Sequence, residues 1–397
     1  MKQSTHILSL TLILAFSAAC RSTSDTPDWV WFAGDLHVHS SGASNDTDGL
    51  SWPEDIAATA RERGLDWLVL TDHSNSTGSM HCEDVEDCPN LGPEFPWQDE
   101  VTRLSDATFV MVDGNELSPV ARSPGMGEAR GHVGCLPPRD GFTFDGAFID
   151  RPDGDVTGAS AVEQCVAVGG WAIVNHPFPG VPWITYDWST TTGFQGLEVW
   201  NGGLRWDQGD ERALAAWECL VASGASVVPV AGSDNHKISI AIPGTELDPP
   251  LGQPRTSVAL EPGTPLTWPA IRNALAAGRV LLHEENTEIV ASRDPESATW
   301  MLRGHSPLPS RLELRRIPLG TNCDPSDPDG TLHEVVFDAS VEGAFEQLTP
   351  IATALEANEQ GPLYAAITRD AMAPSMEGDV AMTGLIATLL PQSTGGL

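Results

Sequence analysis

Positive charge is scarce in this sequence, and lysine is almost absent. Its 397 residues hold 21 Lys and Arg against 55 Asp and Glu, a formal net charge of −34, and the lysines are Lys2 and Lys237. A surface of this kind repels phosphate backbones and anionic headgroups, which argues against a nucleic-acid polymer as partner. A small anionic substrate is still compatible with the composition, because bound cations can reverse the field inside one pocket.

Long apolar runs are missing beyond the N-terminus. No later segment offers 18 consecutive apolar residues, so we expect no transmembrane span. Ile7 to Phe16 is a ten-residue apolar run, and the small residues after it end in Cys20. This stretch resembles a bacterial lipoprotein signal, which is cut before Cys20 and leaves that cysteine lipidated. Ser17 departs from the usual pattern, and an ordinary secretory signal is the alternative.

Both alternatives predict an exported protein. We therefore expect a signal peptide over residues 1–19 and a tether over residues 20–30, with a periplasmic or cell-surface location and a lipid anchor as the only membrane contact. Cysteine usage agrees, because six cysteines remain beside Cys20 and an even number suits an oxidising compartment. Cys82 and Cys88 form the easiest local pair, whereas the other pairings stay open and buried free thiols are the alternative.

Apolar runs of β type alternate with helical patterns along residues 31–285. The helical patterns cover Pro53–Arg63, Gln208–Ala222 and Trp268–Ala277. Strands that alternate with helices form parallel βα units, and seven of them indicate a closed or nearly closed α/β barrel, whose chemistry lies at the C-terminal ends of its strands. The seven expected strands are Trp31–Asp35, Trp67–Thr71, Thr108–Gly114, His132–Leu136, Trp171–Asn175, Gly196–Trp200 and Val227–Ala231.

Histidine and carboxylate side chains gather at the ends of these runs. Side chains at i and i+2 of a strand share a face, so His37 and His39 can both project into a barrel mouth, as can Asp234 and His236. Imidazoles and carboxylates together suit divalent zinc, manganese or iron, and their number exceeds what one ion uses, so we expect two or three ions. The candidates are His37, His39, His73, Glu116, His132, His176, Asp234 and His236.

The order of these motifs is specific. DLHVHS, DGLSWPEDIAATARERGLDWLVLTDH, GNE, GH, NHP and GSDNH follow one another between Trp31 and Glu285. In this order the chain resembles the PHP (polymerase and histidinol phosphatase) superfamily of metal-dependent hydrolases. Within it the chain is most similar to the CehA/McbA group, whose usual features match EVWNGG, GQPRTSVAL and AIRNALAAGRVLL. The resemblance implies a distorted (β/α)7 barrel over residues 31–285.

The resemblance also implies a distribution of the ligands over the ions. His37, His39, Glu116 and Asp234 match the ligands of a first ion. Glu116 would bridge to a second ion, which His132 and His176 also hold. His73 and His236 match ligands of a third, which Asp48 completes as the best match and Asp46 as the alternative; if neither reaches the cluster, a dinuclear site is expected.

The resemblance favours hydrolysis by a metal-activated water. His73 or His236 would protonate the leaving group, and Arg130, Asn201 and Lys237 are candidates for contacting the substrate, with a surface role as the alternative for the two cations. Phosphoester cleavage on a small exported substrate is the leading expectation. The alternatives are a carbamate, ester or amide hydrolase of the CehA/McbA type and a metal-binding lipoprotein without turnover.

Two further expectations concern supporting residues. Asp35 and Asp72 neighbour ligating histidines, so they would either orient imidazoles or cap turns. The region 286–397 changes character: alternating runs at Arg311–Ile317, His333–Ala339 and Pro362–Thr368 are separated by turn residues, which predicts a small, mostly β unit without chemistry of its own.

Overall fold

The structure is a computed structural model, and the described part of the chain has a mixed α/β fold. It describes residues 29–41, 43–44, 47, 49–74, 97–118, 131–144, 157–179, 184–202, 206–238, 249–293, 299–328, 330–352, 361–369 and 380–383. The predicted signal, residues 20–28 of the predicted tether with Cys20, the Cys82–Cys88 pair, Asp46, Asp48 and Arg130 lie outside these residues. None of the described helices is long and apolar enough to cross a membrane.

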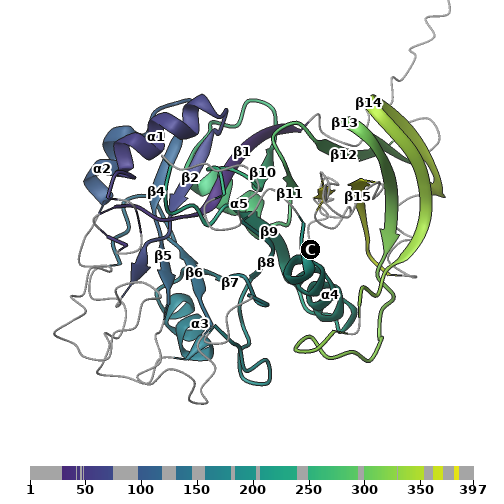
Figure 1. Cartoon of the computed structure of the whole chain (residues 1–397), viewed down its shortest axis with the longest axis horizontal. Helices are drawn as coiled ribbons and strands as arrows, with labels where there is room; N and C mark the ends of the chain where they lie inside the picture. The colour runs from purple at the N-terminus through teal and green to yellow at the C-terminus, as the bar shows by residue number, and fades with distance from the viewer. Residues whose placement is uncertain are drawn as a thin grey trace, which may run out of the picture.

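Strands β1 to β16 form two sheets, and the α/β class expected from the sequence is confirmed (Figure 1). The six-stranded sheet follows the order β3 (His73–Ser74), β5 (Asn115–Leu117), β6 (Val133–Leu136), β7 (Trp171–Val174), β8 (Gly196–Asn201) and β9 (Val228–Gly232). The ten-stranded sheet follows the order β12 (Glu288–Arg293), β13 (Thr299–Arg316), β15 (Leu363–Arg369), β16 (Val380–Thr383), β11 (Val280–His283), β10 (Arg255–Leu260), β1 (Val30–Val38), β2 (Trp67–Leu70) and β4 (Val110–Asp113), with β14 (Glu334–Ala352) beside β13.

The two sheets meet at two seams. At the first, the chain runs from β4 through Gly114 directly into β5, so one extended segment belongs to both sheets. At the second, the end of β1 pairs with the segment after β9 through a parallel bridge between Val38 and Asn235. Among the described residues, the strand pairings form two sheets, and no closed barrel is detected. All seven strands expected from the sequence are nevertheless present as β1, β2, β4, β6, β7, β8 and β9.

Strand β6 differs from the all-parallel expectation. It runs antiparallel to both β5 and β7, whereas the β1–β2, β2–β4, β7–β8 and β8–β9 pairs are parallel. Alternating hydrophobicity reports that a segment is a strand and says nothing of its direction.

Five described helices flank the sheets: α1 (Pro53–Glu62), α2 (Gln98–Leu104), α3 (Gly158–Ala167), α4 (Gln208–Ala222) and α5 (Trp268–Ala276). The chain starts α4 with a capping box, in which Asp207 accepts hydrogen bonds from the backbone of Gly209 and Asp210. Thr267 caps α5 in the same way, by accepting from Ala270. Three of the helices thus begin where the sequence predicts them. Disulfides join β6 to α3 through Cys135–Cys165 and α4 to the loop after β13 through Cys219–Cys323.

The C-terminal strands extend the ten-stranded sheet outward, on the right in Figure 1. β16 pairs with β11, and the long strands β13 and β14 form an antiparallel ribbon. A second hydrophobic core lies under this region, built around Trp300, Leu302, Leu312 and Ile367. The elements described after residue 286 are the strands β12, β13, β14, β15 and β16.

Candidate metal centre

The predicted ligands converge from six strands. His37 lies in β1, His39 one residue beyond it, His73 in β3 and Glu116 in β5; His132 precedes β6, His176 follows β7, and Asp234 and His236 follow β9. All eight lie in one cluster beside the seams between the sheets. Four overlapping groups of three residues in it present ligand atoms within 4.8 Å of one another. The ninth expected ligand, Asp48, lies outside the described residues.

The carboxylate of Glu116 stands at the centre of the cluster. Imidazole nitrogens from five histidines surround its two oxygens. The distances are 3.2 Å to His37 Nε2, 3.8 Å to His39 Nε2, 2.9 Å to His73 Nδ1, 3.3 Å to His132 Nδ1 and 3.2 Å to His176 Nε2. Glu116 is fully buried. A buried carboxylate with imidazoles on both oxygens could be shared between two ions.

Asp234 forms a second point of convergence. Its Oδ1 lies 3.1 Å from the Nε2 atoms of both His37 and His39 and 3.7 Å from Nδ1 of His236. The backbone of Asp234 is left-handed, with φ at 52°, and its N–H donates to the carbonyl of His37 at 2.9 Å. Another ligand candidate, His176, has φ at 25°. Non-glycine residues in this region are strained, and such strain is typical of functional sites.

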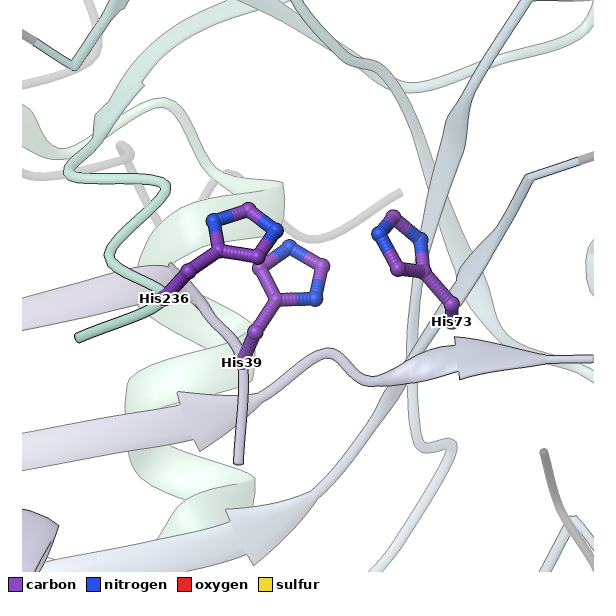
Figure 2. A group of neighbouring side chains, drawn as sticks. All are labelled: His39, His73 and His236. Atoms are coloured by element: carbon purple, nitrogen blue, oxygen red, sulfur yellow. The ribbon is translucent and has the colours of Figure 1, made fainter. Parts of the chain in front are cut away.

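Three imidazoles form a group of their own at one side of the cluster. Figure 2 shows His39 and His236 close together with the ring of His73 turned toward them. The rings of His39 and His236 are stacked, with centroids 4.0 Å apart and planes at 12°, and the centroid of His73 lies 4.4 Å from that of His39. His39 therefore belongs to the expected first group and also to this one. Three imidazole donors of this kind suit zinc and similar borderline ions.

The donor set fits metal ions better than it fits hydrogen bonding within the protein. Nε2 of His37 is buried, and it makes no hydrogen bond with any described residue although two carboxylate oxygens lie 3.1 and 3.2 Å away. A buried ring nitrogen aimed at the space between two carboxylates would be satisfied by a cation.

Electrostatics prepare most of these groups to act as ligands. Burial lowers the pKa of His39 to about 3, with help from His236 and His73, and burial also lowers the pKa of His132. Both imidazoles are thus neutral at physiological pH. Burial opposes ionisation of Glu116, but His132 and His37 hold its pKa well below the ordinary value, and His37 does the same for Asp234. Both carboxylates are therefore ionised.

The pKa of His37 is shifted in the opposite direction to that of His39. Burial disfavours its charged form, but the carboxylates of Asp234, Glu198 and Glu116 raise its pKa well above the ordinary value. A cation bound at Nε2 of His37 would displace a proton held there, so metal binding at His37 would be coupled to proton release.

The orienting residues are not the two aspartates that the sequence offers. Asp35 accepts from the backbone of His37, Ser233 and Gly252, and Asp72 accepts from Ser40 and from the hydroxyl of Ser44. Both therefore bind backbone and serine donors, in the turn-capping manner. Short loops at strand ends present many backbone N–H groups close to an aspartate, which explains why Asp35 and Asp72 bind these donors and not the imidazoles.

Imidazole contacts come instead from residues that the motifs do not single out. Oε1 of Glu198 lies 2.9 Å from Nδ1 of His37, the hydroxyl of Ser118 lies 2.7 Å from Nδ1 of His73, and that of Ser44 lies 3.2 Å from Nδ1 of His39. Glu198 was visible in the sequence as an acid inside the apolar run Gly196–Trp200, a signal that sequence reasoning noted only as part of EVWNGG.

The three substrate candidates have different surroundings. Asn201 lies at the end of β8, and its side-chain amide donates to Glu198 Oε2 at 2.9 Å and reaches Asp234 Oδ2 at 3.4 Å. It thus contacts the carboxylates of the cluster. Lys237 is half-buried and directly follows His236. Arg130, just before the segment that leads to His132, lies outside the described residues.

No protein-family model and no curated protein matches this chain. Solved structures that are similar to part of this chain include the lesion-specific endonuclease PfuEndoQ of Pyrococcus furiosus, with 16% identity and a TM-score of 0.39 over 62% of this chain and 56% of that chain. PsfC of Pseudomonas syringae is 18% identical to this chain, with a TM-score of 0.39, over 59% of this chain and 84% of that chain. A Bifidobacterium adolescentis protein assigned as a metal-dependent phosphoesterase is 14% identical, with a TM-score of 0.36, over 61% of this chain and 95% of that chain. The chain thus matches little more than half the length of the endonuclease.

Proposed function

We propose that this chain is a metal-dependent hydrolase of the phosphoesterase type, with two or three divalent ions in the histidine–carboxylate cluster of a distorted, PHP-like (β/α)7 barrel. One observation carries the proposal: the buried Glu116 carboxylate lies among imidazole nitrogens of five histidines. A structural histidine is satisfied by one or two protein partners, whereas five around one carboxylate are explained by shared ions.

Bound ions would supply an activated water and stabilise the charge that develops on the oxygens of a phosphoryl group. The residues of the chain have separate tasks. Glu116 and Asp234 neutralise positive charge from two sides, and the buried imidazoles of His39 and His132 offer neutral lone pairs. His73 or His236 protonates the leaving group in this proposal. Lys237, beside His236, binds an anionic part of the substrate.

We also propose that the protein is exported and attached to a membrane only through Cys20, and that its substrate is a small molecule. The two disulfides, Cys135–Cys165 and Cys219–Cys323, support export because such bonds persist in oxidising compartments. The acidic composition supports a small substrate over a nucleic-acid chain.

Elemental analysis combined with turnover tests the function. The soluble form without residues 1–20 should hold two or three equivalents of transition metal and hydrolyse p-nitrophenyl phosphate. His37→Ala and Asp234→Ala should lose metal and activity together. His305→Ala, which changes a histidine of β13 outside the cluster, serves as the matched control and should keep both.

The same samples distinguish the alternatives. Faster turnover of an aryl ester or carbamate than of the phosphoester would point to carbonyl chemistry of the CehA/McbA type. Metal retention without turnover of any of these substrates would point to a binding protein. Less than one equivalent of metal in the unmodified protein, restored by no added ion, would overturn the proposal.

A further inference from the structure

Glu198 is a buried carboxylate that no proposed ion-binding role uses. It lies in β8 among apolar residues and is 1% exposed. Burying a carboxylate in such surroundings is unfavourable unless hydrogen bonds compensate it. The hydrogen bonds described for Glu198 all come from residues of the metal cluster or their immediate support: His37, His176 and Asn201.

Its first oxygen selects a tautomer of His37. Oε1 lies 2.9 Å from Nδ1 of His37, and a carboxylate oxygen acts as the acceptor in such a bond, which places the hydrogen on Nδ1. The neutral ring then presents its lone pair at Nε2, the atom that faces Glu116 and Asp234. Glu198 thereby fixes both the orientation of this ring and which nitrogen can bind an ion.

Its second oxygen holds two other parts of the cluster. Oε2 accepts from the backbone N–H of His176 at 2.8 Å, at the residue whose φ is 25°. It also accepts at 2.9 Å from the side-chain amide of Asn201, which reaches the carboxylate of Asp234 at 3.4 Å. The carboxylate therefore stabilises a strained backbone that carries one ligand and, through one amide, orients another.

The neighbouring strand leaves room for this arrangement only because residue 232 is glycine. A Cβ at Gly232 would lie 2.5 Å from Cβ of His37 and 2.9 Å from Oε1 of Glu198. The backbone of β9 thus packs directly against the Glu198–His37 pair. Close approach of this kind holds the pair in one position.

We propose that Glu198 is the positioning residue of the metal centre, a single carboxylate that fixes ligands of two expected ion positions, His37 of the first and His176 of the second. The inference rests on the proposed function, because it concerns the same centre. Asn201 is then part of the positioning network, which adds a role to its candidacy for binding substrate.

Glu198→Gln tests the role with little change in volume. The amide must place its NH2 group either against Nδ1 of His37, which favours the tautomer with hydrogen on Nε2, or against the donors of His176 and Asn201. Both placements disturb a ligand. In the full chain we expect the affinity for Zn²⁺ and for Mn²⁺, measured by competition with a chelator, to fall roughly 10- to 100-fold. The visible spectrum of the Co²⁺-loaded protein should change as well.

Glu218→Gln is the matched control. Glu218 is also a fully buried glutamate, but it binds the backbone of Leu332 and His333 and the hydroxyl of Tyr364, away from the metal cluster. It should lower the stability of the fold and leave ion affinity and the Co²⁺ spectrum unchanged. If Glu198→Gln fails to fold, Asn201→Ala removes one bond of the network and should weaken Zn²⁺ binding by roughly 3- to 10-fold.

Two results would overturn the positioning role. One is wild-type ion affinity in Glu198→Gln, or in Asn201→Ala where that variant takes its place. The other is an equal loss of affinity in Glu218→Gln, which would make the effect one of general stability. The proposed function fails separately: ion binding by the wild type without turnover removes the hydrolase and leaves the affinity comparison valid, whereas turnover with unchanged affinity in Glu198→Gln removes only the positioning role.

Discussion

The Oε1 atom of Glu116 lies 3.2 Å from Nε2 of His37, and both side chains are buried. The two residues come from different sheets, β5 and β1, so this contact closes the candidate site across a seam of the fold. Changes at Glu116 should therefore affect every ion position that the cluster offers.

Glu116→Gln should remove at least one ion equivalent and lower turnover by at least roughly 100-fold. The amide keeps the shape of the side chain but loses the charge that draws cations toward five imidazoles, and a neutral bridge stabilises two ions poorly. Metal content and p-nitrophenyl phosphate turnover measure the effect. Glu163→Gln, at an exposed position of α3, is the control. Full metal content and activity in Glu116→Gln would contradict a bridging role.

Lys237→Met should raise the KM for a phosphomonoester by roughly tenfold, because a hydrogen bond from a charged group contributes about 1.5–3 kcal/mol. Methionine keeps the apolar stem and removes the ammonium. The KM for a neutral aryl ester should change little. Steady-state kinetics on both substrates check this, and equal effects on the two would argue against recognition of an anionic group.

His283→Gln should flatten part of the pH dependence of stability. Burial, reinforced by the charge of Arg255, lowers the pKa of His283 to about 4 in the folded state, compared with 6.5 ordinarily. Between these values the unfolded chain takes up a proton that the folded chain does not, so the free energy of unfolding falls as pH falls from 6.5 to 4, by up to about 3 kcal/mol.

Urea unfolding of wild type and variant, between pH 4 and 7 in the presence of a chelator, measures this difference. His283 accepts from Ser257 and contacts the carbonyl of Glu284, outside the metal cluster, so the contributions of the cluster cancel in the comparison. Parallel curves for the two proteins would show that His283 carries no such linkage.

Tyr364→Phe should destabilise the fold by about 1–3 kcal/mol and leave metal content unchanged. The hydroxyl of Tyr364 donates to the buried carboxylate of Glu218, while its ring packs edge-on against Trp217 with centroids 5.3 Å apart. Phenylalanine keeps the packing and leaves Glu218 one donor short. Denaturant unfolding measures the change, and a midpoint equal to that of the wild type would show that the other donors to Glu218 suffice.

Much of the candidate centre can be predicted because strand ends are visible in the sequence. Apolar runs mark β1, β7 and β9. The polar residues that follow such buried strands lie at the strand ends, where they meet in a shared site. The helices α1, α4 and α5 are predicted for a similar reason, since proline or a capping residue marks each start. These signals lie within a few residues of each helix start, so the sequence alone is enough to place the three helices.

The parts that escape prediction depend on contacts between distant segments. The bond from Glu198 to His37 and the pairing of β16 with β11 are set by tertiary packing, which no periodicity encodes. The length of β13 is hidden for another reason: Pro307 and Pro309 interrupt its pattern, and its pairing with β14 continues across an irregular register between Ser306 and Ser310.

The candidate ligands are spread over residues 37–236. Bound ions would therefore connect segments that are distant in the sequence, and they could do so only after these segments have come together in folding. No short segment of the described chain presents the whole set, so an extended chain would lack the complete site. Acquisition would follow chain collapse. The compartment in which the chain folds, and the free ions available there, would then decide which metal it holds, with the Irving–Williams order of affinities competing against supply.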